Sequence, residues 1–246
     1  FVSDPDADGL MRLFEEIGNA GKHVALMAHV SHPRELEPPV THEAIRRIQG
    51  AGAVIRTQAP LIRGVNDEAD IWAQLWRDQT ALGMVPYYMF LARDTGARHY
   101  FQVPLAEGLA ICNGATRLVS GIARTARGPV MSATPGKVLV DAVGEMGGKD
   151  VFILKFLQGR DPRWAGKVFF ARFDPRASWL DELSPITAES EFFFESQMRE
   201  LEAGLGRVAW PQATARPISY RRGGLRRPRG PGEYTRLRSA PDPGQP

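Results

Sequence analysis

The chain has 246 residues, of which 43% are hydrophobic, enough to build the core of one α/β domain or of one domain with an appendage. No run approaches the roughly 18 consecutive apolar residues of a membrane span, and we expect a cytoplasmic protein. The single cysteine, Cys112, excludes an internal disulfide and a cysteine cluster within the chain. The sequence begins with Phe1 and has no signal peptide, so we expect it to begin inside a longer protein.

The formal net charge of +3 is unevenly distributed. Residues 216–246 hold eight arginines against one Glu and one Asp, a charge of +6, so residues 1–215 carry −3. The segment is rich in Arg, Pro and Gly and poor in apolar residues, which predicts a disordered tail over 211–246. Binding of this tail to nucleic acid or another anionic polymer is the less favoured alternative to a solvated tail.

Amphipathic helices and apolar strands alternate in the first part of the chain. Helical spacing of apolar residues predicts helices over 8–20, 41–52, 67–83 and about 104–125. Thr41 and Asp67 are expected to be the N-caps of the second and third of them. Strand formers dominate 22–30, 53–59, 84–92 and 128–134. Nearly apolar strands that each follow a helix indicate a parallel sheet with helices on its outer face.

The similar plan and length of these units favour a (β/α) barrel over a doubly wound sheet. Because four strands cannot close a barrel, we predict an α/β fold that is an open sheet or the C-terminal part of a partial (β/α) barrel. Two further strands, 149–161 and 166–174, and a helix over 189–204 predict a short β-rich extension. The expected domains are the partial barrel (1–140), the extension (141–210) and the tail (211–246).

Polar groups follow the carboxyl ends of the four predicted strands. In parallel α/β sheets, functional groups gather at that edge, so these residues predict a ligand site there. They are His29, Ser31, His32, Arg56, Gln58, Arg93, Asp94, Thr134 and Lys137.

Several of these residues allow two interpretations. Lys137 follows a Thr-Pro-Gly turn, where it is either an ordinary exposed lysine or a half-desolvated amine that captures an aldehyde as a Schiff base. His29 and His32 have no further ligands at matching spacing, so we predict no metal site, and they either bond to a cofactor or cap the loop. Tyr87, Tyr88 and Phe90 belong to the core or to a stacking surface, and Arg93 holds an anion or forms a surface ion pair.

Five segments of the chain form one collinear pattern over about residues 22–140, namely MAHVSHPREL, RTQAPLIRGVND, VPYYMFLARD, HYFQVPLAEGL and SGIARTARGPVMSATPGK. Together they resemble the lysine 2,3-aminomutase family of radical S-adenosylmethionine enzymes. The resemblance implies a radical S-adenosylmethionine barrel that is truncated at its N-terminus and lacks the CxxxCxxC motif. It implies an isomerase that uses pyridoxal 5′-phosphate, S-adenosylmethionine and a [4Fe–4S] cluster whose ligands are absent here.

The resemblance also implies roles for individual residues. Lys137 forms the Schiff base with pyridoxal 5′-phosphate, and His29, Gln58 and Tyr87 bind this cofactor or S-adenosylmethionine. In the family, two aspartates hold the ε-ammonium of lysine. The aligned positions in this sequence are Arg93 and Val130.

These departures predict a substrate other than lysine, a free or protein-linked amino acid with an anionic side chain such as that of glutamate. The full-length protein is expected to be a homo-oligomer, and this chain alone is expected to be inactive. The alternative is a non-catalytic remnant that binds a small anion or pyridoxal phosphate without radical chemistry.

Overall fold

The computed structural model describes residues 2, 4, 6–93, 98–186 and 191–205. The predicted tail over 211–246 lies outside the described residues, and so does Asp94. None of the helices in these ranges is long and apolar enough to cross a membrane.

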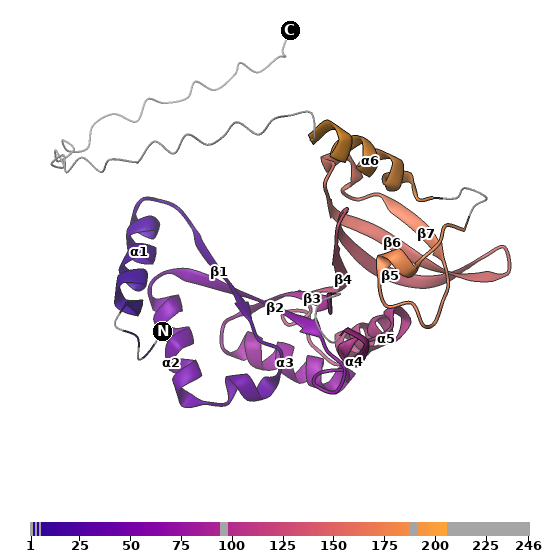
Figure 1. Cartoon of the computed structure of the whole chain (residues 1–246). Coiled ribbons are helices and arrows are strands. Elements are labelled where there is room, and N and C mark those ends of the chain that lie inside the picture. Colours follow the sequence, from indigo (N-terminus) through magenta and orange to yellow (C-terminus); the bar gives the residue numbers. More distant parts are fainter. Residues whose placement is uncertain (1, 3, 5, 94–97, 187–190, 206–246) are drawn as a thin grey trace, which may run out of the picture. The chain divides into compact units, whose positions relative to one another are not determined.

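In the described part of the chain, seven strands form one sheet in which every strand lies beside its neighbours in sequence (Figure 1). The first four strands pair in parallel, and the last four, β4 to β7, pair antiparallel. The strands are β1 (Val24–His29), β2 (Ala53–Leu61), β3 (Val85–Leu91), β4 (Arg127–Ala133), β5 (Gly136–Met146), β6 (Lys149–Gly159) and β7 (Val168–Arg172).

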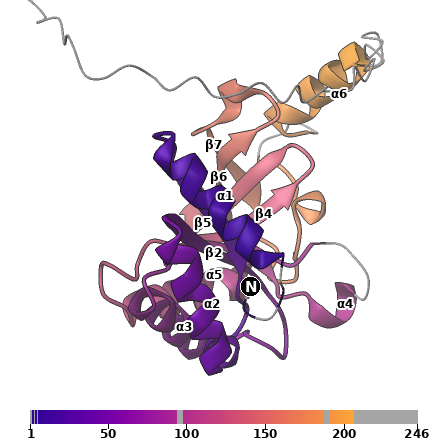
Figure 2. The same ribbon diagram turned by 90° about the vertical axis from the view of Figure 1, so that its left-hand side faces the viewer.

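A helix precedes each of the parallel strands, which confirms the predicted helix–strand units. Figures 1 and 2 show α2, α3 and α5 together on one side of these strands. This mixed α/β architecture is that of a partial α/β barrel with a β-rich extension. The helices are α1 (Ala7–Asn19), α2 (Pro39–Gly50), α3 (Ala69–Ala81), α4 (Arg98–Phe101), α5 (Leu105–Arg117) and α6 (Phe193–Leu205), with short 3-10 turns η1 (Pro33–Leu36), η2 (Pro162–Trp164) and η3 (Leu180–Glu182).

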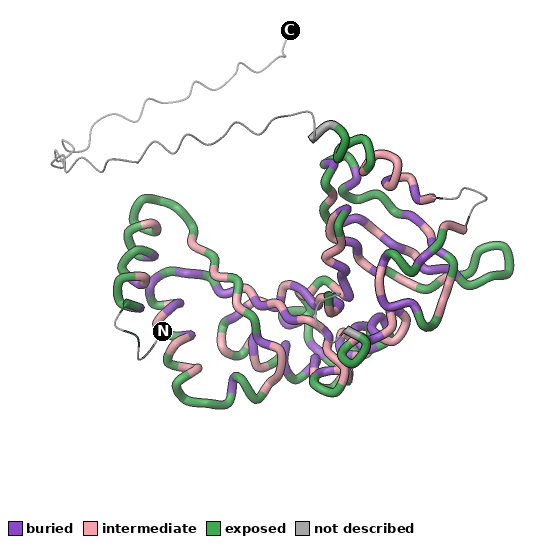
Figure 3. The backbone as a smooth tube through the Cα atoms, viewed as in Figure 1, coloured by how far each residue is buried: buried purple, intermediate pink, exposed green. Residues whose placement is uncertain are grey.

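The two faces of the parallel strands have different roles. Every second residue of β2, from Ala53 to Leu61, is buried, and the colours of the tube in Figure 3 alternate along this strand. All of them except Thr57 belong to the same core cluster as Trp72 and Leu75 of α3. Since side chains alternate along a strand, the residues between them point to the opposite face, which is free for a ligand site.

Two predicted helix caps are wrong. Helix α2 begins at Pro39 with Pro38 as its N-cap, so Thr41 lies inside the first turn. The fixed φ of proline suits the first position of a helix, and Pro39 therefore sets the start of α2. The N-cap of α3 is Glu68 rather than Asp67, and its side chain makes no capping bond.

The sequence analysis also missed a strand and placed one helix end too late. Helix α5 ends at Arg117, eight residues before the expected end at 125. Residues 136–146 form β5, so Lys137 lies within a strand instead of in a turn. Because β5 crosses the expected boundary between residues 140 and 141, the sheet runs continuously through it, and the division into domains stays a prediction.

An aromatic cluster lies among the antiparallel strands, within the single core of the described residues. Phe156 of β6 lies 5.6 Å from Trp164 and 5.4 Å from Phe169, measured between ring centroids. Phe193 and Phe194 of α6 close the cluster, at 6.0 and 5.3 Å from Phe156. This cluster supports the sheet beside the parallel strands.

Candidate functional site

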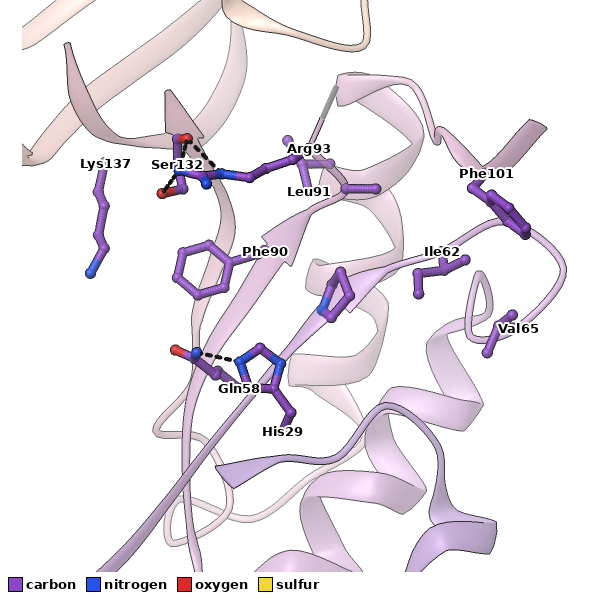
Figure 4. Close-up of a pocket in the computed structure, with 12 residues that line it drawn as sticks. His29, Gln58, Ile62, Val65, Phe90, Leu91, Arg93, Phe101, Ser132 and Lys137 are labelled. Atoms are coloured by element: carbon purple, nitrogen blue, oxygen red, sulfur yellow. Dashed lines mark hydrogen bonds between the residues drawn. The ribbon is translucent and has the colours of Figure 1, made fainter. Parts of the chain in front are cut away.

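A pocket of about 720 Å³ lies beyond the carboxyl ends of the parallel strands (Figure 4). Four residues singled out from the sequence line it, namely His29, Gln58, Arg93 and Lys137, each from a different strand or strand end. Tyr87 does not line it. The remaining lining residues are Pro60, Ile62, Val65, Phe90, Leu91, Ala92, Phe101 and Ser132.

The β4–β5 hairpin carries Lys137 to this pocket. A two-residue turn, Thr134 and Pro135, joins the strands, and Lys137 pairs directly with Ser132 of β4. Directly paired residues project to the same side of a sheet, so the Lys137 amine and the Ser132 hydroxyl belong to one surface.

The amine of Lys137 lies against aromatic rings. Its Nζ is 4.9 Å from the ring centroid of Tyr88 and 5.9 Å from that of Phe90. The two rings stack on each other with centroids 4.8 Å apart. Among the described residues, no Asp or Glu forms an ion pair with Lys137. The amine is therefore held by ring faces, not by a carboxylate.

A β-bulge places two consecutive tyrosines side by side. The β2–β3 register shifts between Thr57 and Gln58, which leaves Tyr87 as the extra residue on β3. The rings of Tyr87 and Tyr88 consequently meet edge to face, 4.4 Å apart, where a regular strand would point them to opposite faces. Burial raises the pKa of Tyr88, although its hydrogen bond with Arg127 acts in the opposite direction.

Arg93 reaches from the end of β3 to β4. Its Nη2 donates to the Ser132 carbonyl at 3.1 Å and to the Ser132 hydroxyl at 3.2 Å, and Figure 4 shows these bonds at the pocket wall. Neither acceptor is charged, so the guanidinium retains its positive charge at the pocket. Val130, two residues earlier on β4, is fully buried and offers the pocket no polar group.

The two histidines after β1 have different surroundings. The His29 ring nitrogen Nε2 lies 2.7 Å from the Gln58 amide nitrogen, and both side chains line the pocket. His32 accepts a hydrogen bond from the Arg34 amide through Nδ1, and Glu35 accepts one from the His32 amide, forming a capping box at η1. His32 is thus a loop cap, whereas His29 remains available to a ligand.

Asn66 fastens the loops beside the pocket. It is fully buried, and its side-chain amide donates to the carbonyls of Ser31 and Pro60 at 2.9 and 3.0 Å. Its side-chain oxygen accepts from the Ile62 amide at 2.7 Å, and its backbone carbonyl accepts from the Trp72 indole. One amide therefore ties the loop after β1 to the loop after β2.

The chain's one cysteine is not suited to metal binding. Cys112 is buried on α5, its thiol donates to the Gly128 carbonyl at 3.1 Å, and burial raises its pKa to about 12. In the ranges that the structure describes, no three His, Cys, Asp or Glu side chains are grouped to hold a metal ion. A [4Fe–4S] cluster does not fit this single buried thiol, since such clusters need several thiolates.

Parallel strands with polar groups at their carboxyl edge define the class of α/β barrel-type proteins with a strand-end ligand site. No protein-family profile matches the chain. The chain is 30% identical to a putative L-lysine 2,3-aminomutase of Aquifex aeolicus over 186 residues. These residues make up 75% of the chain and 48% of that protein. It is 35% identical over 104 residues to a putative L-lysine 2,3-aminomutase of Treponema pallidum, covering 41% of the chain and 28% of that protein.

A glutamate 2,3-aminomutase of Clostridioides difficile is 26% identical over 100 residues, which cover 41% of the chain and 24% of that protein. The chain belongs to the lysine 2,3-aminomutase family. It spans about half the length, or less, of these curated relatives.

The sequence analysis named the aromatic partners of Lys137 but missed Ser132. Tyr88 and Phe90, left open between core and stacking surface, contact the amine, and Ser132, which was not singled out, receives Arg93. The regular alternation of strand residues could have identified Ser132. The bulge that turns Tyr87 to the same face leaves no signal in the sequence.

Proposed function

We propose that this chain is the pyridoxal phosphate-holding part of a radical S-adenosylmethionine aminomutase, with Lys137 as its covalent anchor. The observation that carries the proposal is the position of the Lys137 amine in a pocket of about 720 Å³ that it shares with His29, Gln58 and Arg93. An amine on an aromatic wall fits an aldehyde-bearing planar ring, which can stack where the amine now lies.

Each pocket residue has a chemical task in this proposal. The Lys137 amine would hold the cofactor covalently through its aldehyde. Tyr88 and Phe90 orient the amine and keep water from its aromatic side. When bound, pyridoxal phosphate supplies a conjugated π-system that assists transfer of an amino group between neighbouring carbons.

His29 and Gln58 supply hydrogen-bonding nitrogens at the neighbouring strand ends, and either can bind S-adenosylmethionine or the cofactor. The chain's one thiol is buried, and its raised pKa keeps it protonated, so this thiol does not suit an iron–sulfur cluster.

The substrate that suits this pocket is an amino acid with an anionic side chain. The Arg93 guanidinium would repel the ammonium of lysine and attract a carboxylate, with which it can form two parallel hydrogen bonds. Ser132 holds the guanidinium in place without neutralising it. The likeness to a protein named glutamate 2,3-aminomutase supports the same substrate class.

The anchor is tested by adding pyridoxal 5′-phosphate, reducing with borohydride and mapping the modified peptide by mass spectrometry. We expect a pyridoxyl phosphate group on Lys137, and no such group on the peptide from Lys137→Ala. Lys155→Ala is the matched control, since this β6 lysine does not line the pocket. Labelling of folded protein only at other lysines would refute the anchor and leave the non-catalytic alternative.

Substrate class is tested on the cofactor-loaded chain by the change in visible absorbance when amino acids are added. Glutamate should give a saturable change at concentrations at least about 10-fold lower than lysine does, since a charge-assisted pair contributes more than 1.4 kcal/mol. Arg93→Gln should abolish that preference and keep the cofactor. A preference for lysine in the unmodified chain would contradict the proposed substrate class.

A further inference from the structure

Three cations lie along one row of aromatic rings on the helix-free face of the sheet. Arg56 of β2 lies 5.1 Å from the Tyr87 ring centroid, and Arg127 of β4 lies 5.6 Å from the same ring. Arg127 also lies 6.0 Å from the Tyr88 ring, on which the Lys137 amine rests at 4.9 Å. Lys137 and Arg127 therefore share one ring, and Arg127 and Arg56 share the next.

No acidic side chain of the described residues forms an ion pair with any of these three cations. The Tyr88 hydroxyl does not compensate either, because its raised pKa keeps it neutral at physiological pH. Residues 1–215 carry a net charge of −3, so acidic residues are abundant elsewhere in this part of the chain. Like charges repel one another, and an uncompensated group of three creates a strong local positive potential.

The bulge explains why these charges gather. Arg56 and Gln58 are two residues apart on β2 and so project to the same face, the face of the pocket. The extra residue in β3 turns Tyr87 to this face as well, between the arginines of the two flanking strands. Both guanidinium groups lie within cation–π distance of the ring and carry N–H donors that can bind an anion.

We propose that Arg56 and Arg127 form an anion site that holds the phosphate group of the ligand whose aldehyde is bound by Lys137. This inference rests on the proposed function and adds to it the residues that select a phosphorylated aldehyde. Arginine is suited to phosphate because its fork of donors matches two phosphate oxygens. An amine and an anion site on one aromatic row constitute two-point recognition of a phosphorylated aldehyde.

The test compares binding of pyridoxal 5′-phosphate with binding of pyridoxal, which lacks the phosphate, by visible absorbance titration. We expect the unmodified chain to bind the phosphorylated form at least about 10-fold more tightly. Arg127→Gln and Arg56→Gln should each weaken its binding about 10-fold or more and leave pyridoxal binding unchanged. Arg127→Lys, which keeps the charge, should recover part of the loss, a result that a folding defect would not give.

Arg77→Gln is the matched control, because Arg77 is exposed on α3 and donates only to Gln74 among the described residues. It should bind both compounds as the unmodified chain does. Equal binding of pyridoxal and its phosphate, or unchanged affinity in the Arg56→Gln/Arg127→Gln double variant, would overturn the phosphate site and leave the Lys137 anchor intact.

Failure of the unmodified chain to bind either compound would instead refute the anchor. Binding of inorganic phosphate, followed by ³¹P NMR, then tests the anion site independently of Lys137. Broadening of its ³¹P resonance by the unmodified chain, lost in the double variant, would support the site, and absence of broadening would overturn it.

Discussion

The parallel and antiparallel halves of the sheet use their faces in opposite ways. In β1–β4, one face packs on helices and the other presents polar and charged groups around a pocket. In β6 and β7, aromatic side chains cluster with η2 and α6 and pack mainly against one another. The same residue types thus form the wall of a pocket in one half and part of the core in the other.

The difference shows that the antiparallel half supports the site without lining most of it. Its contribution to the pocket is Lys137, carried by β5. Strand β5 pairs with β4, the last of the parallel strands, over Gly136–Leu139 and with β6 over Gly136–Met146. Loss of the aromatic cluster should therefore displace Lys137, although no aromatic residue of that cluster lines the pocket.

Phe156→Ala, in the antiparallel half, is expected to cause the largest loss of stability. Phe156 is fully buried, so removing its ring should lower the free energy of unfolding by about 3–5 kcal/mol through lost burial and a cavity. Denaturant unfolding followed by circular dichroism measures the change. Because β5 pairs with both β4 and β6, we expect a single cooperative unfolding transition that shifts to lower denaturant concentration.

Val168→Ala on β7 is the matched control, since that side chain is 49% exposed and its loss should cost no more than about 0.5 kcal/mol. Two separate transitions in Phe156→Ala, with the parallel half unfolding at the unmodified denaturant concentration, would show that the halves are independent.

Asn66→Ala gives a smaller effect and acts in the parallel half alone. The substitution leaves the Ile62 amide and the carbonyls of Ser31 and Pro60 without their buried partner, at a cost of roughly 2–3 kcal/mol. Thermal or denaturant unfolding measures it, with Asn113→Ala on the exposed side of α5 as control. A loss no greater than that of the control would mean that the two loops are held by other contacts.

The sequence predicted the helix–strand units because their apolar spacing is local and strong. It did not predict β5, since Gly136–Met146 gains its strand structure from long antiparallel pairing with β6, which no local pattern encodes. The caps at Thr41 and Asp67 failed for a related reason, because a proline at N1 and an extended Glu68 decided the helix starts.

The candidate site was predicted to the level of strand ends and no finer. Alternation and the parallel sheet bring His29, Gln58, Arg93 and Lys137 to one pocket. The positions of Tyr87 and Tyr88 could not be predicted, since a bulge depends on the register between strands. The charges of Arg56 and Arg127 were visible in the sequence, but the shared tyrosine that joins them was not.

The β4–β5 turn decides by its length which face the Lys137 amine occupies. One residue more or less between Ala133 and Gly136 would reverse the parity of the strand and point the amine to the helix-covered face. Gly136 has a φ of 150°, and a Cβ there would come within 2.1 Å of the Gln158 carbonyl oxygen. No residue with a side chain therefore fits at the start of β5. A change in length of the Gly147–Gly148 turn, which follows β5, would leave the face of Lys137 unchanged and would instead alter the register of β6.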